Sequence, residues 1–144
     1  MSLPTGKLPP DLLRDFLGTI GAGDDSVVVS AAVGEDAAVI DVGGPELLVA
    51  KTDPITLAAR DVGRLLLAVN SNDLATMGAT PRWLLASVLM PETATPDDAR
   101  SLLDGLASAC RGSQVALVGG HTEVTDGLER PVVVGCLLGT VPPN

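Results

Sequence analysis

Apolar positions along this chain recur with two spacings, one typical of helices and one typical of strands. The helical spacing predicts three amphipathic helices, at residues 12–20, 62–77 and 95–111. Gly21 and Gly112 can close the first and the third of these helices. Asp61 can cap the second, and Gly78 follows it where a left-handed residue is favoured. The third helix begins Thr95-Pro96-Asp97-Asp98, which combines a cap, a proline and acids in the first turn.

Short apolar runs between glycines and prolines predict strands. They lie at residues 27–29, 37–40, 47–50, 83–90, 115–118 and 132–138. The last two are almost continuously apolar, so we expect both of their faces to be buried. Together the elements predict an α+β fold with a mixed, largely antiparallel sheet and the two long helices on one face. The other face would also be apolar, and a homodimer joined sheet to sheet would cover it.

Composition predicts a single folded domain over residues 1–144, because 46% of the residues are hydrophobic and 19% are charged. Phe16 and Trp83 are the only aromatic residues and the net charge is −9, which argues against nucleic-acid binding. Residues 1–10 have no apolar run typical of a signal peptide, and no segment is apolar enough to span a membrane. We therefore expect a cytoplasmic protein. Cys110 and Cys136 lack metal-ligand spacing and are expected to be reduced core cysteines, with a disulfide or metal pair as the alternative.

Three acidic stretches place a carboxylate beside apolar or small residues, where an ionised group is costly to keep. They are Gly34–Ala38, Lys51–Asp53 and Asn70–Ala79. Asp73 continues the helical stripe of Val62, Leu65, Leu66 and Val69, so its carboxylate is aimed at the core. Several carboxylates of this kind suggest a divalent metal ion, with phosphate as the second ligand.

A fourth stretch adds Gly119 and Gly120 after a predicted strand. Adjacent glycines let backbone N–H groups approach a ligand closely, as phosphate loops require. Each signal also has an ordinary structural explanation. Asp36 can be a turn residue, Asp53 a solvated acid at a strand end, and the glycine pair a tight turn. Asp73 can be a buried acid that is bonded only to backbone groups.

Taken in order, the four stretches resemble the N-terminal domain of the AIR synthetase (PurM-like) superfamily. This superfamily includes aminoimidazole ribonucleotide synthetase, the hydrogenase maturation factor HypE, thiamine-monophosphate kinase and selenophosphate synthetase. The chain looks most similar to HypE-like and AIR-synthase-related proteins. The residues that carry the resemblance are Gly34–Val39, Thr52-Asp53, Asn72–Pro81 and Gly119–Thr122.

The resemblance implies an ATP-binding domain in which Asp36, Asp53 and Asp73 hold Mg²⁺ on the triphosphate or organise its phosphates. The residues expected to contact the nucleotide are Lys51, Thr52, Asn72, Gly119, Gly120, His121 and Thr122. Lys51 would meet a phosphate, although a surface lysine at a strand end is an equal alternative. The resemblance also implies a dimer in which the sheets of two domains form a barrel.

The chain departs from the family pattern in two respects. His121 stands where the family commonly has an acid, and a neutral imidazole is a poor Mg²⁺ ligand. It can bond a phosphate or donate to a carboxylate, with Glu123 in the acid's place, or it can be a polar loop residue without such a role. The family's C-terminal domain is also missing, so we expect a fragment or a domain that needs a separate partner chain.

The sequence therefore predicts the ATP-binding half of an enzyme that activates a substrate by phosphorylation, inactive by itself. A non-catalytic dimerisation or regulatory module is the alternative, favoured by His121 and the missing domain. An acid-lined Ca²⁺ or Mn²⁺ site without nucleotide is a third reading.

Overall fold

The computed structural model describes residues 3, 5–20, 24–56 and 60–143. These residues form an α+β fold with a six-stranded sheet in the order β1-β2-β3-β6-β4-β5. All neighbouring strands are antiparallel except β4 and β5, which are parallel. The elements are α1 (Pro10–Leu17), β1 (Val27–Val29), β2 (Ala38–Ile40), β3 (Leu47–Ile55), α2 (Val62–Thr76), β4 (Thr80–Pro91), α3 (Pro96–Gly112), β5 (Ala116–Thr125) and β6 (Val132–Val141).

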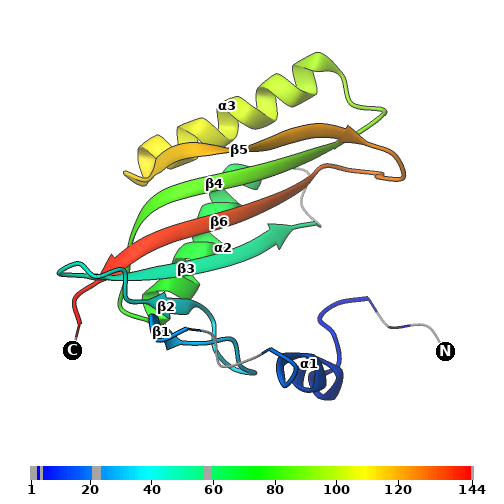
Figure 1. Ribbon diagram of the computed structural model, residues 1–144. Coiled ribbons are helices and arrows are strands. Elements are labelled where there is room, and N and C mark those ends of the chain that lie inside the picture. The colour runs from blue at the N-terminus through cyan, green and yellow to red at the C-terminus, as the bar shows by residue number, and fades with distance from the viewer. Residues whose placement is uncertain (1–2, 4, 21–23, 57–59, 144) are drawn as a thin grey trace.

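The two long helices cover one face of the sheet, as predicted. Helix α2 crosses behind β3, β6 and β4, and α3 lies along α2 and β5 (Figure 1). The core lies between the helices and this sheet face, which we call the helix face. On the central strands every second side chain is buried there, including Leu84 and Val88 of β4 and Val133 and Leu137 of β6.

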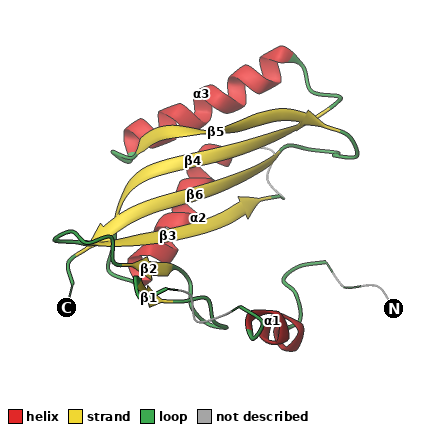
Figure 2. Cartoon of the chain, viewed as in Figure 1, coloured by secondary structure: helices red, strands yellow, loops and turns green. Residues whose placement is uncertain are grey.

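The opposite, open face of the sheet is uncovered by any described helix (Figure 2). Trp83 and Leu85 on β4 lie on this face and are 37% and 38% exposed. Their neighbours on β6, Leu138 and Cys136, are half-buried. An apolar open face was expected from the sequence. Cys136 is a free thiol on it, and Cys110 is a free thiol in the core.

Helix α1 is shorter than predicted, since it ends at Leu17, with Gly18 as its C-cap residue. Gly21, the residue expected to close it, lies outside the described part of the chain. None of the helix is buried, and it lies away from the sheet beyond the β1 edge (Figure 2). In the described residues, no helix is long and apolar enough to cross a membrane.

The predicted ends of the long helices are mostly confirmed. Thr95 and Asp98 form a capping box at the start of α3, and α3 includes Gly112 rather than stopping before it. Gly78 follows α2 with a φ of +70°, as expected. Asp61 is the N-cap residue of α2, as predicted, but the expected side-chain cap is wrong. Its φ is +52° and its side chain makes no capping hydrogen bond.

Strand β3 continues five residues beyond the predicted end at Ala50 and carries Lys51 and Asp53 within it. The reason lies in its pairing. Strand β2 pairs only with Leu48–Ala50, while β6 pairs along all of β3. Pro54, which has no N–H to donate, is therefore tolerated where β3 has a neighbour on one side only.

Strand β5 excludes one alternative explanation and contradicts one prediction. The chain does not turn at Gly119 and Gly120, because β5 continues through both glycines to Thr125, with a register irregularity at Val118 just before them. The strand is also almost entirely exposed rather than buried on both faces, since it is the edge strand and has only β4 beside it. Strand β6 is not buried on both faces either, because its buried and half-buried residues alternate.

Helix α2 is rotated relative to the predicted apolar stripe. Leu65 and Val69 belong to that stripe but are exposed. The buried residues of α2 are Val62, Gly63, Leu66, Leu67, Asn70 and Leu74. The polar side chain at the centre of the buried stripe is therefore Asn70, while Asp73 lies at its margin.

Candidate functional site

A cluster of three charged side chains lies where the last turn of α2 meets the middle of β3. Lys51 Nζ is 2.7 Å from Asp73 Oδ2 and 3.5 Å from Asp53 Oδ2. The side chains of Lys51, Asp53 and Asp73 are 17%, 31% and 22% exposed. Two carboxylates from separate elements thus converge on one cation in a partly buried position. We call these three residues the Lys51 cluster.

The strand period explains why Lys51 and Asp53 act together. Residues two apart on a strand point to the same face, and here that is the helix face. Lys51 pairs with Leu137, and Asp53 pairs with Gly135. Thr52, between them, lies on the open face, where its hydroxyl donates to the Gly135 carbonyl at 2.9 Å.

Two glycines of β6 let α2 pack close enough to the sheet for Asp73 to contact Lys51. A Cβ at Gly135 would lie 3.0 Å from Leu66 Cγ and 3.1 Å from Asn70 Nδ2. A Cβ at Gly139 would lie 2.7 Å from Leu74 Cδ2. Larger residues at these positions would push the helix away from the sheet, and Asp73 would move with it.

Partial burial shapes the electrostatics of the Lys51 cluster. Burial and the neighbouring Asp73 carboxylate raise the pKa of Asp53, against the opposing field of Lys51. Burial by itself disfavours the charged form of Lys51. The hydrogen bond to Asp73 and the fields of both carboxylates together outweigh it, so the pKa of Lys51 is raised. The cluster therefore holds its ammonium firmly and carries one uncompensated negative charge.

Sequence reasoning missed Asn70 as a residue of interest. Its side chain is completely buried, and its Nδ2 donates to the Leu66 carbonyl at 2.9 Å. Its Oδ1 is buried without a hydrogen-bond partner among the described residues. Asn70 lies one turn before Asp73 on α2 and packs against Gly135, the residue of β6 that pairs with Asp53. Asn70 could be recognised only once it was known which side of α2 faces the core.

The other predicted metal and nucleotide residues of the first half of the chain lie outside this cluster. Asp36 is exposed in the loop before β2, and Asn72 is exposed on α2. Ala38 at the start of β2 pairs with Ala50 of the antiparallel strand β3. Asp36, two residues before Ala38, therefore lies at the same end of the strand pair as Asp53. Within the described ranges, no three His, Cys, Asp or Glu side chains gather in a group that could hold a metal ion.

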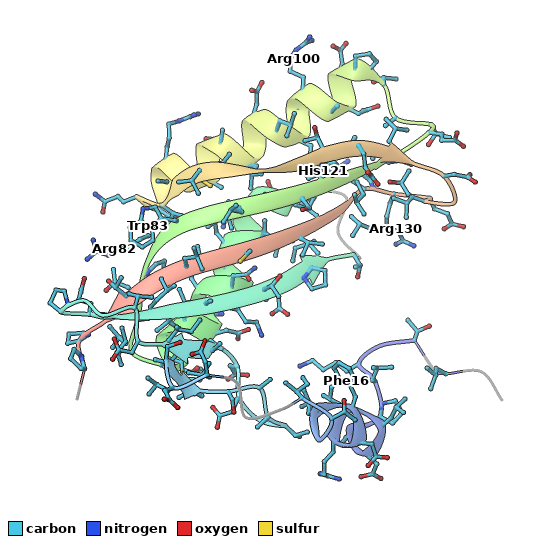
Figure 3. All side chains as sticks on the ribbon, in the orientation of Figure 1. Phe16, Arg82, Trp83, Arg100, His121 and Arg130 are labelled. Atoms are coloured by element: carbon cyan, nitrogen blue, oxygen red, sulfur yellow. The ribbon has the colours of Figure 1, made fainter. Side chains whose placement is uncertain are left out.

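The predicted residues of β5 are separated from the Lys51 cluster. Strands β6 and β4 lie between β3 and β5, which corresponds to about 14 Å at the usual strand spacing. His121 pairs with Ser87 on the open face, and Thr122 pairs with Val88 on the helix face. Figure 3 labels His121 on β5 and Trp83 near the start of β4.

His121 is part of a small hydrogen-bonded series along β5. Its Nε2 lies 2.9 Å from Glu123 Oε2, and the Thr125 hydroxyl donates to Glu123 Oε1 at 2.8 Å. The hydrogen bond from His121, followed by that from Thr125, lowers the pKa of Glu123. Of the alternatives that the sequence leaves open for His121, the structure shows a hydrogen bond to the Glu123 carboxylate. All three side chains lie on one side of the strand, because their spacing is two.

Known structures share this architecture. The hydrogenase maturation protein HypE, solved in complex with ATP, matches with a TM-score of 0.62 at 25% sequence identity, over 77% of this chain and 35% of that one. The fold therefore defines an α+β domain of the PurM-like class. The family model for the AIR synthase related protein, N-terminal domain, matches residues 34–141. The chain belongs to this family, and the resemblance found in the sequence is confirmed.

Curated relatives span several members of the family. A Methanocaldococcus jannaschii protein assigned to hydrogenase expression and formation is 28% identical, over 94% of this chain and 42% of its own length. A selenide, water dikinase of Dechloromonas aromatica is 34% identical, over 81% of this chain and 35% of its own length. The chain thus covers well under half of the length of these relatives.

Proposed function

We propose that this chain is the nucleotide-binding half of an ATP-dependent enzyme and that it binds ATP together with Mg²⁺. The observation that carries the proposal is that the carboxylates of Asp53 and Asp73 converge on the ammonium group of Lys51. Membership of the AIR synthase related family supports it, as does the ATP complex of the HypE structure with the same fold. The relatives are longer than this chain, which supports a second domain or a partner chain that binds the acceptor substrate.

The residues present suit Mg²⁺. This ion takes oxygen ligands, and in phosphate sites it usually has one or two carboxylates, with phosphate and water oxygens completing its shell. Asp53 and Asp73 supply two carboxylates in one place. In this proposal Asp36 is the third acidic ligand, because it precedes β2 at the same end of the β2–β3 pair as Asp53. When bound, Mg²⁺ supplies neutralisation of the charge that develops on phosphate oxygens.

The protein's own share is to position the phosphates. Lys51 provides a positive charge beside the carboxylates, and in this proposal its ammonium donates to a phosphate oxygen. Asn72, exposed on the same helix as Asp73, can donate from its side-chain amide. Gly119 and Thr122 remain predicted nucleotide contacts from β5, at the far side of α2.

Calorimetry with a non-hydrolysable ATP analogue and Mg²⁺ tests the proposal. We expect binding to the unmodified chain that EDTA abolishes, and at least a tenfold loss of affinity in Asp73→Asn. Asp104→Asn is the matched control, because Asp104 is exposed on α3 and the charge change is identical. Equal analogue affinity in Asp73→Asn and Asp104→Asn would remove the site from this proposal. Metal binding that ignores the analogue would favour a plain cation site instead.

We further propose that the open face is a homodimer interface. It carries Trp83, Leu85 and Leu138 with no described helix over them, and apolar sheet faces of this kind mark protein contacts. Leu85→Asp should convert a dimer into a monomer in light scattering after gel filtration, while circular dichroism stays unchanged. A monomeric unmodified chain at the same concentrations would refute the interface.

A further inference from the structure

Lys51 occupies the position that a metal ion shared by Asp53 and Asp73 would take. Its ammonium faces Oδ2 of both carboxylates, at 3.5 and 2.7 Å. An Mg²⁺ ion bound to the same oxygens would lie about 2.1 Å from each of them. An ammonium group and a metal ion cannot both be in that space.

The surrounding structure holds Lys51 in this position. Exposed lysine–carboxylate pairs are usually loose and contribute little. Here the lysine side chain is only 17% exposed, and its partners come from two elements held together by the close packing of α2 on Gly135. Lys51 also shares its strand face with Asp53, so the backbone directs both side chains to the side on which Asp73 lies.

Charge favours exchange over coexistence. The two carboxylates carry two negative charges, and Lys51 compensates one of them. A divalent ion added beside the retained ammonium would make the cluster positive and place two cations in contact. A divalent ion that replaces the ammonium compensates both carboxylates. The flexible lysine stem lets the released ammonium move to a nearby anion, and a nucleotide phosphate supplies one.

We propose that Lys51 is a built-in competitor for the metal ion: it holds Asp53 and Asp73 together in the metal-free domain and is displaced when the metal enters. This inference rests on the metal site of the proposed function. It implies that metal by itself binds weakly, because it must expel Lys51. Metal and nucleotide bind cooperatively, because the phosphates accept the displaced ammonium.

Titration with Mn²⁺ in the absence of nucleotide tests the competition directly, with free Mn²⁺ measured by electron paramagnetic resonance. Lys51→Met should bind Mn²⁺ at least tenfold more tightly than the unmodified chain. The chain has one other lysine, Lys7, which is exposed in the N-terminal segment. Lys7→Met changes the net charge equally and should leave Mn²⁺ affinity unchanged. Equal or weaker Mn²⁺ binding by Lys51→Met would overturn the proposal.

A second measurement uses the unmodified chain and avoids any folding defect of the variant. Acetylation of Lys51 is followed by mass spectrometry, with Lys7 as the internal reference. Saturating Mn²⁺ should increase the labelling of Lys51 relative to Lys7 several-fold, because the ammonium leaves its two acceptors. An unchanged or reduced ratio would overturn the proposal.

The two measurements separate this inference from the proposed function. If Mg²⁺ and the ATP analogue bind through Asp73 while Lys51→Met has no effect on Mn²⁺ affinity, the competition fails and the nucleotide site stands. If Lys51 competes with Mn²⁺ but no analogue binds, the nucleotide site fails and the competition stands.

Discussion

Gly120 offers the sharpest test of why two glycines stand together on β5. A Cβ added at Gly120 would lie 1.8 Å from the Ala86 carbonyl oxygen, 2.6 Å from its carbon and 2.8 Å from the Ala86 nitrogen. All three are backbone atoms of β4, so no side-chain rotation can relieve the contact. At Gly119 an added Cβ would meet nothing within 4 Å. The φ angles are similar, +150° and +158°.

The expected magnitude follows from that difference. Gly119→Ala adds only backbone strain, at the lower end of the usual range, about 1 kcal/mol. Gly120→Ala adds the same strain and also forces β5 away from β4 until the 1.8 Å contact with the Ala86 carbonyl oxygen is relieved, an overpacking that costs about 3 kcal/mol. We therefore expect Gly120→Ala to lower the free energy of unfolding by about 4 kcal/mol, a large share of the total for a domain.

Urea unfolding measures both variants, and Trp83 on β4 is a single fluorescent reporter of the strand that β5 contacts. Equal destabilisation by Gly119→Ala and Gly120→Ala would refute the reasoning, because it would mean that β5 does not approach Ala86 as closely as described. The comparison also bears on function. If Gly119 is needed for nucleotide approach, Gly119→Ala should weaken binding of the ATP analogue while stability changes little.

Two further predictions concern the interior and the Lys51 cluster. Asn70→Leu should raise the free energy of unfolding by about 1 kcal/mol, because it removes a buried acceptor without a partner; a loss of stability in urea unfolding would show that Oδ1 has a partner in solution. The raised pKa of Lys51 contributes stability that is fully present below the ordinary lysine pKa, about 10.4, and that is lost as the pH rises through the raised value. Unfolding measured from pH 9 upward should therefore show a steeper loss for the unmodified chain than for Lys51→Met. Burial raises the pKa of the Cys110 thiol in both chains alike, and parallel curves would contradict the assignment to Lys51.

Local chemistry made several elements predictable from the sequence. The start of α3 depends on Thr95, Pro96 and Asp98, which are adjacent in the chain and act within one turn. The end of α2 depends on Gly78, whose backbone freedom is a property of that residue alone. The strand centres were found because their apolar runs are short and bounded by glycine or proline.

The rotation of α2 could not be predicted in the same way, because close contacts at two glycines, one in α2 itself and one on the distant strand β6, determine it. A Cβ at Gly63 would lie 2.7 Å from Leu106 Cα of α3, and one at Gly135 would touch Leu66 and Asn70. The helix therefore packs most closely where a glycine lies on one side of the contact. A hydrophobic stripe counts apolar side chains and is blind to such contacts, so it predicted Leu65 at the buried side and placed Asp73 too deep.

The four stretches that look like one site in the sequence are divided between the two faces of the sheet. Lys51 and Asp53 point to the helix face, whereas Thr52 between them points to the open face. His121 shares the open face through its pairing with Ser87. Chain order determines that Thr52 faces away from Lys51 and Asp53, but the register of each strand determines which of the two sets faces the helices.

This division limits what one ligand can touch. The Lys51 cluster and Thr122 both lie on the helix face but are separated by α2, which packs across β3, β6 and β4, whereas His121 lies on the open face. A nucleotide contact from Thr52 or His121 therefore requires a ligand on the open face, where the proposed dimer partner would lie. At the exposed edge strand, His121 and Glu123 have the position of the polar rim of such an interface, where polar side chains keep contact with water.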